Sequence, residues 1–315
     1  MNIVKILVVG TGVIGTIYGW ALAESGNEVV HYVRKGKKDA CNGGIKVQML
    51  DERKGRPKHG KFTYYPACAE DVPEDVELVI VPVGSHQLEA VLLELSPKLG
   101  KAQFLIMSSN WQGTDHIDRI LSRDRYLLGY ADGGGTYREG MLLANLGPNV
   151  HLGELDGQNS QRLQGLIDLF RKADMTPEVA ANILHWLWVH NATSVAIWAG
   201  FQQYREMKPF LKDGALVKDS FQATKECLDI CRKRGVDVDH IGEISYFKYP
   251  VWLLALIFKL IFTFNKSMQI YTAHAASEAS MKEMKGNFLA IYHSGKSLDM
   301  SLPYMDKLYV LMEKG

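Results

Sequence analysis

The residues whose types and spacing best fit a chemical task lie close to the start of the chain. Gly10, Gly12 and Gly15 form a G-x-G-x-x-G pattern between the apolar run Ile6–Val9 and the helical pattern Ile14–Ala23. In such a turn the first glycine permits a tight bend, the second leaves room for phosphates, and the third lets helix and strand pack closely. The helix N-terminus attracts the anion. This context predicts a dinucleotide site rather than a glycine-rich turn without a ligand. We expect the dinucleotide to contact Gly10, Thr11, Gly12, Val13, Ile14 and Gly15.

A basic run after the second predicted strand, Glu28–Val33, bears on the choice of coenzyme. Residues 34–38 read Arg-Lys-Gly-Lys-Lys, and the next carboxylate along the chain is Asp39. An NAD site usually places an acidic residue here for the ribose 2′-hydroxyl, whereas NADP needs a cation for its 2′-phosphate. A guanidinium can also pair with a phosphate through two hydrogen bonds. We therefore expect NADP, bound by Arg34 and Lys35; the alternative is a solvated loop.

The elements that would position these residues alternate between strand and helix up to about residue 150. Further strands are expected at residues 76–83, 102–107, 126–130 and 149–152, with a helix through Leu88–Leu95. The glycine run Gly133–Gly135 is expected in a loop between the last two strands. This alternation predicts an α/β, Rossmann-like, doubly wound parallel sheet. Ligands of such sheets bind beyond the carboxyl ends of the strands, which is where residues 84–87 and Asn110 fall.

The second half of the chain has a different, helical character. After Gly157 a helix is expected at Gln161–Ala173, and Pro177 then interrupts the pattern. Helical periodicity continues at residues 180–200, 214–234, 251–264, 267–293 and 304–313. We therefore expect residues 1–175 to form an NADP-binding Rossmann domain, and residues 176–315 to form a helical domain for substrate binding and dimerisation. The substrate would bind in a cleft between them.

Bulk properties of the 315-residue chain exclude several classes of protein. A net charge of +1 gives no reason to expect nucleic acid or an anionic membrane as partner. The chain enters its first predicted strand almost at once, so we expect no signal peptide and a cytoplasmic location. The four cysteines show no metal-ligand pattern with histidines, so we expect no metal site and, in the cytosol, reduced thiols. They are Cys41, Cys68, Cys227 and Cys231.

One segment, Val251–Phe264, is intensely apolar. It has 14 residues and includes Lys259, whereas a membrane-spanning helix needs about 20 apolar residues. A core helix or a subunit interface is the favoured interpretation, which makes a homodimer possible. A helix lying on a membrane surface, beginning at Pro250, is the alternative.

Several further positions match the pattern of a known family. They are Gly10, Gly12 and Gly15 with Arg34, then Gln87, Asn110 within Ser-Asn-Trp-Gln-Gly, the stretch His151–Gly157, and Glu283 followed by Pro303. With these positions the chain resembles the ketopantoate reductase family over nearly its whole length. The family is NADPH-dependent and has a helical second domain like that of 6-phosphogluconate dehydrogenase. The resemblance implies reduction of a 2-keto acid or related ketone, with 2-dehydropantoate, on the pantothenate pathway, as the default substrate.

The resemblance also implies roles for individual residues. Gln87 and Asn110 would contact the cofactor, and Asn110 would also lie near the nicotinamide and the substrate. Glu283 would hydrogen-bond a substrate hydroxyl. An amide can donate to a carboxylate, and a carboxylate can accept from a hydroxyl. For Glu283 the alternative is a solvated charge beside Lys282 and Lys285.

The chain departs from the family where a proton-donating lysine is expected. That lysine opens the first long helix of the second domain in a Lys-x-x-x-Asn pattern. The preferred register places Trp186 at the lysine and His190 at the asparagine. A shift by one residue would place Leu187 at the lysine and keep Asn191.

Histidines are the candidates to supply the missing proton. Hydride transfer to a ketone makes an alkoxide that must be protonated, and histidine can donate near neutral pH. His185 and His190 are five residues apart, about 140° around a helix, so they cannot both face one substrate. His190 is the better candidate because the polar stretch 191–194 follows it, and His274 is a third option. We expect His190, Asn110 and Glu283 to be catalytic; the alternative is an NADP(H)-binding sensor or interaction protein that has lost catalysis.

Overall fold

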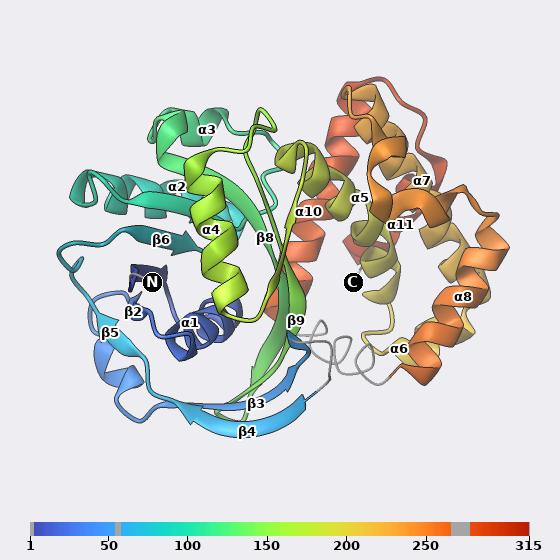
Figure 1. Ribbon diagram of the computed structural model, residues 1–315. Coiled ribbons are helices and arrows are strands. Elements are labelled where there is room, and N and C mark those ends of the chain that lie inside the picture. Colours follow the sequence, from blue (N-terminus) through green and yellow to red (C-terminus); the bar gives the residue numbers. More distant parts are fainter. Residues whose placement is uncertain (1–2, 54–57, 266–277, 315) are drawn as a thin grey trace. The chain divides into compact units, whose positions relative to one another are not determined.

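The computed structural model describes residues 3–53, 58–265 and 278–314. The chain forms two compact units that divide between Leu184 and His185 (Figure 1). The first unit is a Rossmann-like sheet with helices and the second is helical, so the predicted fold class is confirmed. The division falls after the expected boundary at 175/176 because residues 176–179 still pair with the sheet.

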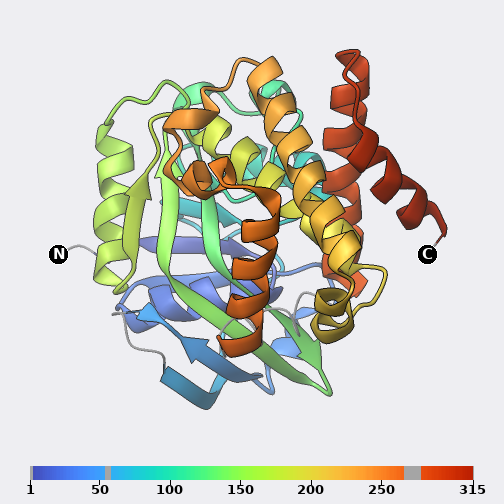
Figure 2. The ribbon, with the colours of Figure 1, turned by 90° about the vertical axis from the view of Figure 1, so that its right-hand side faces the viewer.

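The first unit contains one mixed sheet. Its described strands are β1 (Lys5–Val9), β2 (Glu28–Tyr32), β3 (Ile45–Asp51), β4 (Lys58–Tyr64), β5 (Ala67–Ala69), β6 (Leu78–Val81), β7 (Gln103–Ile106), β8 (Tyr126–Arg138), β9 (Met141–Gly153) and β10 (Thr176–Val179). Their order is β4-β3-β9-β8-β7-β6-β1-β2-β5, with β10 beside β9. The strands around β1 are parallel, whereas β3–β4 and β8–β9 are antiparallel. Figure 2 shows the long pair β8 and β9 in green.

The helices of the first unit are α1 (Val13–Glu24), α2 (Ser85–Leu95), the short α3 (Asp115–Asp118) and α4 (Gln161–Lys172), with a 3₁₀ helix η1 (Lys38–Cys41). Those that follow are α5 (Ile183–Phe201), α6 (Met207–Lys212), α7 (Gly214–Lys233), α8 (Val251–Phe264), α10 (Glu278–Ser297) and α11 (Pro303–Lys314). The periodicity of the sequence predicted most of these helices. Of the helix expected at 267–293, residues 267–277 lie outside the described residues.

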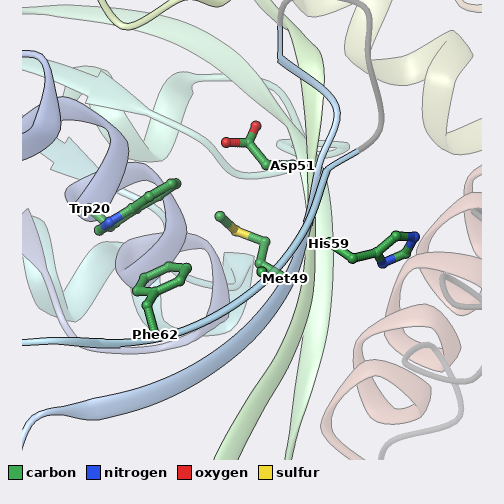
Figure 3. Close-up of a pocket in the computed structure, with 6 residues that line it drawn as sticks. Trp20, Met49, Asp51, His59 and Phe62 are labelled. Atoms are coloured by element: carbon green, nitrogen blue, oxygen red, sulfur yellow. The ribbon is translucent and has the colours of Figure 1, made fainter.

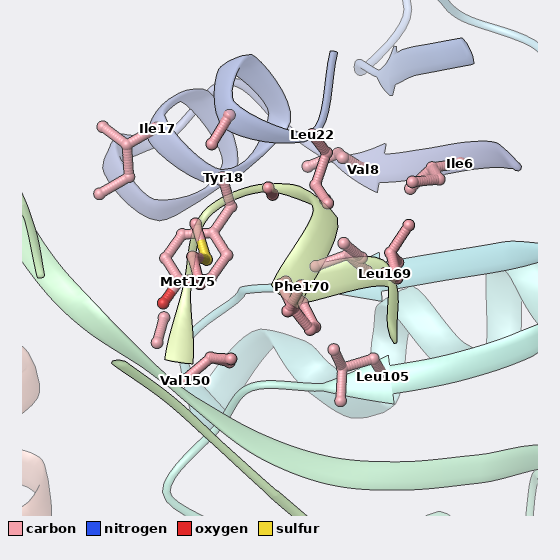
Figure 4. Packing of buried hydrophobic residues seen from close by; sticks show 14 of the residues in the cluster. Ile6, Val8, Ile17, Tyr18, Leu22, Leu105, Val150, Leu169, Phe170 and Met175 are labelled. Atoms are coloured by element: carbon pink, nitrogen blue, oxygen red, sulfur yellow. The ribbon is translucent and has the colours of Figure 1, made fainter. Parts of the chain in front are cut away.

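The core of the first unit lies between the sheet and two helices, α1 and α4. Tyr18 of α1 meets Phe170 of α4 edge to face, with ring centroids 6.1 Å apart. Ile6 and Val8 of β1 are fully buried in the same cluster (Figure 4). A continuous apolar run of this kind is typical of a parallel strand that is buried on both faces. The packing of β1 against α1 holds in place the turn that joins them.

The glycine run Gly133–Gly135 lies inside β8, so the expectation of a loop was wrong. Its pairing with β9 continues through this run after a register shift between Ala131 and Gly133. A Cβ at Gly133 would lie 2.8 Å from the carbonyl oxygen of Asn145, and one at Gly135 would clash with that of Leu143. The glycines therefore mark a bulge and a close backbone approach, which a sequence can mistake for a loop.

The expectation of reduced thiols was wrong for Cys41 and Cys68, which form a disulfide. The parallel pairing of β5 with β2 places Cys68 opposite His31. Cys41 lies at the end of η1, which follows β2 in the chain. The two Cα atoms are 6.6 Å apart, within the range that a disulfide can bridge. Cys227 and Cys231 are free and buried.

Candidate functional site

The turn between β1 and α1 has an open space above its backbone. Gly10 has a φ of +81°, a conformation that favours glycine. A Cβ at Gly15 would lie 2.8 Å from the carbonyl oxygen of Gly10, whereas one at Gly12 would meet no atom within 4 Å. Within the described residues, no side chain caps the first turn of α1. The turn therefore presents amides and a positive helix end to an anion in that open space.

A buried histidine supports this turn from below. His31 of β2 is fully buried, with its Nδ1 2.9 Å from the carbonyl oxygen of Gly10 and its Nε2 3.0 Å from the hydroxyl of Tyr64. A carbonyl only accepts, so Nδ1 carries the hydrogen and Nε2 accepts from Tyr64. Burial lowers the pKa of His31, and the Gly10 carbonyl opposes this. Gly19 leaves the necessary space, because a Cβ there would lie 2.5 Å from Nε2.

The carbonyl of Thr11 is fixed from the other side. The Tyr137 hydroxyl, near the end of β8, donates to the Thr11 oxygen at 2.9 Å, and the Thr16 hydroxyl donates to the same oxygen at 3.1 Å. The carbonyls of Gly10 and Thr11 thus meet protein groups, and the Gly10 amide donates to the Tyr32 carbonyl at 2.8 Å. The uncapped amides that open α1 are left for a ligand. Sequence reasoning missed both His31 and Tyr137.

The basic run forms an exposed loop after β2, which we call the basic loop (residues 34–38). Gly36 has a φ of +75°, and the Lys37 amide donates to the Arg34 carbonyl at 3.0 Å. Sequence reasoning also missed Glu70, which follows β5 and accepts from the Lys38 amide at 3.0 Å. This bond, with the amides of Gly36 and Lys37, lowers the pKa of Glu70. The basic loop therefore carries four cationic side chains, and the Glu70 carboxylate binds its backbone.

The loops after β6 and β7 meet at the carboxyl ends of their strands. The hydroxyls of Ser85 and Ser109 are 3.0 Å apart. Gln87 is half-buried in the first turn of α2. Asn110 is buried, has a φ of +46°, and donates through Nδ2 to the Ser108 carbonyl at 2.9 Å. Both predicted cofactor contacts thus lie where a parallel sheet binds its ligands.

In the second unit, α5 carries two histidine–tryptophan pairs. His190 stacks on Trp186 with ring centroids 4.9 Å apart, and His185 stacks on Trp188 at 5.6 Å. The Arg234 guanidinium lies 3.6 Å from the Trp188 ring centroid. Burial, together with the charge of Arg234, lowers the pKa of His185. Arg234 thus forms part of the surroundings of His185.

The polar stretch after His190 is largely engaged with its own helix. The hydroxyls of Thr193 and Ser194 donate to the His190 carbonyl at 2.8 Å and 3.3 Å. Nδ2 of Asn191 donates to the Leu187 carbonyl at 2.9 Å. Such back-bonding is common for these residue types inside helices. The stretch is therefore weaker support for a polar site than its composition suggested.

Glu283 is exposed on α10 beside Lys282. Lys285, three residues after Lys282, donates to the Met312 carbonyl at 3.1 Å. Asn110 belongs to the first unit, while His190 and Glu283 belong to the second, so their meeting in one site stays a prediction. The third candidate, His274, lies outside the described residues.

The turn and the basic loop fall within a segment that matches a known family. Residues 6–157 match the model of the family described as ketopantoate reductase PanE/ApbA. Over these residues, the chain is a member of the ketopantoate reductase family. The predicted resemblance is thereby confirmed, while the replacement of the family's lysine stays a prediction.

Individual relatives agree with this family. The 2-dehydropantoate 2-reductase of Archaeoglobus fulgidus is 24% identical over 204 residues, which cover 62% of this chain and 63% of the relative, under two thirds of its length. The crystal structure of 2-dehydropantoate 2-reductase from Geobacter metallireducens GS-15 has a TM-score of 0.75 and 18% identity, covering 99% of both chains. A ternary structure of D-mandelate dehydrogenase with NADH and anilino(oxo)acetate has a TM-score of 0.72 and 17% identity, covering 98% of this chain and 97% of that one. These structures share the fold of this ketopantoate reductase family member.

One pocket of the first unit lies away from the glycine turn. It is lined by Trp20, Met49, Asp51, His59, Gly60 and Phe62. Trp20 and Phe62 stack at 4.7 Å, while the His59 ring points away from them (Figure 3). Arg53 covers Trp20 at 4.8 Å and donates to Asp51 and to the Ala173 carbonyl. In this ketopantoate reductase family member these contacts join α1, β3 and the end of α4, which gives the pocket a structural role.

One favoured interpretation of the apolar helix α8 was a core helix, and this interpretation was wrong. Leu254 is its one buried residue, and Trp252 and Phe264 are 61% and 77% exposed. Among the described helices, none has both the length and the apolar character needed to cross a membrane.

Proposed function

We propose that the chain is an NADP-dependent oxidoreductase that reduces a 2-keto acid or related ketone, as its 2-dehydropantoate 2-reductase relatives are named for doing. The observation that carries the proposal is the uncapped turn before α1, with open space over Gly12. The turn follows β1, which pairs with β2, and β2 is followed by the four exposed cations of the basic loop. The turn fits a pyrophosphate, and the cations fit a 2′-phosphate.

Different residues of the first unit would bind different parts of the cofactor. Residues 10–15 would surround the pyrophosphate, with the amides that follow Gly10 donating to it, because the Gly10 amide donates to the Tyr32 carbonyl. Arg34 and Lys35 would bind the 2′-phosphate. Gln87 and Asn110 would lie toward the nicotinamide. When bound, reduced nicotinamide supplies a hydride to the carbonyl carbon of the substrate.

The second unit would supply the proton. His190 donates to the alkoxide oxygen that forms from the ketone, a role worth roughly 10²–10⁴ in rate. The Asn110 amide donates to the substrate carboxylate, and Glu283 accepts from a substrate hydroxyl. The second unit would thus serve as the substrate domain.

The choice of NADP over NAD rests on which groups surround the end of β2. The D-mandelate dehydrogenase structure contains NADH, so the shared fold does not decide the coenzyme. Here the carboxylate of Glu70 accepts from the Lys38 amide, and that of Asp39 accepts from the Asn42 side chain. A carboxylate committed to the loop backbone is a poor partner for a ribose hydroxyl, whereas Arg34 remains exposed for a phosphate.

A second candidate is an NADP(H)-binding protein without catalysis, such as a sensor or interaction protein. It is favoured by Trp186, which our register places at the family's lysine and which is buried and stacked on His190. Such a protein would bind NADPH and leave it unreacted. The two candidates therefore differ in turnover, not in binding.

NADPH oxidation over a panel of 2-keto acids and ketones tests the proposal. We expect turnover of one of them, and a loss of about 10²–10⁴ in kcat for His190→Ala with NADPH affinity unchanged. His185→Ala is the matched control on the same helix and should retain activity. Tight NADPH binding without turnover of any substrate would instead support the sensor.

The exposed apolar side of α8 supports assembly of this chain as a homodimer. Its exposed side chains are Trp252, Leu256, Ile257, Leu260, Ile261 and Phe264. Contiguous exposed apolar surface of this kind marks an interaction site. The alternative is that α8 lies on a membrane surface. We propose instead that the chain forms a dimer in the cytoplasm.

A further inference from the structure

The basic loop lies beside the neighbouring strand β5. That strand pairs with β2 in parallel, with Cys68 opposite His31. At the start of the loop, the Val33 amide donates to the Ala69 carbonyl at 2.9 Å. The segment 67–70 therefore runs alongside the point where β2 ends and the loop begins.

Glu70 binds the backbone at the end of the basic loop. Its Oε1 accepts from the Lys38 amide at 3.0 Å, and the amides of Gly36 and Lys37 also lower its pKa. A carboxylate that accepts from a backbone amide of a turn makes a strong, charge-assisted hydrogen bond that helps to fix that backbone. Glu70 is thus a positioning residue for the exposed cations, because it binds their backbone and not their side chains.

The disulfide holds the far end. Cys41 is the last residue of η1, which begins at Lys38, and it is bonded to Cys68 in β5. Cys41 is buried, while Cys68 is half-buried. Segment 33–41, which contains the basic loop, is therefore joined to segment 67–70 at Val33, Lys38 and Cys41. Cys68 is the more exposed of the two cysteines.

We propose that Glu70 and the Cys41–Cys68 disulfide form a clamp that holds the basic loop in the shape that binds a 2′-phosphate. The preference for NADPH over NADH then depends on Glu70 and on the redox state of the cysteine pair. This inference rests on the proposed function. A loop ordered before binding loses less conformational freedom when the ligand arrives. The gain is confined to NADPH, because NADH has no 2′-phosphate to reach the loop.

Closing the clamp requires an oxidant, and a low-molecular-weight disulfide, RSSR, supplies it. The Cys68 thiolate attacks one sulfur of RSSR, the S–S bond breaks, and one RS⁻ leaves. The Cys41 thiolate then attacks the Cys68 sulfur of the mixed disulfide, which forms the Cys41–Cys68 bond and releases the second RS⁻. The cysteine pair loses two electrons and two protons, and RSSR becomes two RSH. A dithiol reverses the reaction.

The redox arm of the test compares the full-length protein in two states by calorimetry. The Kd values of NADPH and NADH are measured after treatment with a small-molecule disulfide and after reduction with dithiothreitol. We expect reduction to weaken NADPH binding about tenfold while the Kd of NADH changes less than about twofold. Cys68→Ser should bind NADPH as the reduced protein does and should respond to neither treatment.

The Glu70 arm uses three variants of the oxidised protein. Glu70→Ala should weaken NADPH binding about tenfold and leave NADH unchanged. Glu70→Gln should restore part of the loss, because its amide oxygen still accepts from the Lys38 amide. Glu74→Gln removes the same charge from an exposed position nearby and is the matched control.

The outcomes separate the clamp from the proposed function. NADPH binding that is indifferent both to reduction and to Glu70→Ala overturns the clamp alone. An equal loss of NADPH and NADH affinity also overturns it, because that result indicates general damage to the fold. Heat from neither coenzyme in either redox state overturns the proposed function, and the clamp with it.

Discussion

Single residues bind the carbonyls of the glycine turn, while the amides that open α1 remain uncapped. His31 holds the Gly10 carbonyl, and Tyr137 holds that of Thr11. Neither residue needs to touch a ligand to affect its binding. Their hydrogen bonds fix the direction in which the peptide groups of the turn point.

Tyr64→Phe tests the buried part of this support. The substitution removes the hydroxyl that donates to His31 Nε2 and leaves a buried acceptor unsatisfied. We expect the free energy of unfolding, measured with urea, to fall by about 1–3 kcal/mol. Tyr65→Phe changes a 70% exposed tyrosine next in sequence and should stay within about 0.5 kcal/mol of the original protein. Equal effects of the two substitutions would contradict this role.

The lowered pKa of His31 predicts a pH dependence of stability. Burial lowers it and the Gly10 carbonyl opposes the shift, so below about pH 6.5 the unfolded chain binds more protons than the folded one. The free energy of unfolding should therefore fall as the pH falls through this value toward the pKa of the folded protein. His31→Asn keeps a donor for Gly10 but does not titrate, and its unfolding should depend less on pH between about 7.5 and 5.5. The same slope in both proteins would contradict the assignment.

The glycine turn and the basic run with Arg34 could be predicted as candidate sites from the sequence because their signals are local. Sequence reasoning missed His31, Glu70 and Tyr137 because their partners are distant in sequence; the Tyr137–Thr11 bond spans 126 residues. The disulfide was missed for the same reason, since it depends on β5 lying beside β2. A histidine within the apolar strand 29–33 was the one available sign of a buried polar contact.

At the scale of elements, the junction of β1 and α1 needs its glycines for two different reasons. Gly15 is required by packing, because a Cβ there would lie 2.8 Å from the Gly10 carbonyl oxygen. Gly12 has open space and a φ of −67°, which any residue can adopt. Its lack of a side chain therefore matters to a ligand and not to the fold.

Two substitutions separate these reasons. Gly12→Val should leave the urea-unfolding free energy within about 0.5 kcal/mol of the original value and abolish measurable NADPH binding. Gly15→Ala should destabilise the protein by about 1–3 kcal/mol, because the helix must move away from the strand. Normal NADPH binding by a folded Gly12→Val protein would contradict the placement of the pyrophosphate.

Element types were easier to predict than their pairing. Apolar runs marked the buried strands and periodicity marked the helices. The hairpin β3–β4 and the edge strand β10 were missed; Pro177 in β10 looked like an interruption, although an edge strand accommodates proline. Gly133–Gly135 looked like a loop because a glycine required by close backbone contact has the same sequence signature as a turn.

At the scale of the whole molecule, the exposed apolar side chains of α8 predict an interaction with a second surface. If α8 forms a homodimer interface, Leu256→Glu combined with Leu260→Glu should produce a monomer, measured by light scattering after size exclusion. Lys259→Glu, which changes the exposed charge of the same helix, is the control. A chain that is monomeric before substitution, or sedimentation with anionic vesicles that depends on the two leucines, would favour the membrane-surface alternative.

Calorimetry with NADPH and NADH is the decisive test of whether the first unit binds NADPH through the glycine turn and Arg34. We predict tighter binding of NADPH, with the preference reduced about 10- to 100-fold by Arg34→Ala, because a hydrogen-bonded charge pair is worth about 1.5–3 kcal/mol. Heat from neither coenzyme, or equal affinities that Arg34→Ala leaves unchanged, would contradict the account.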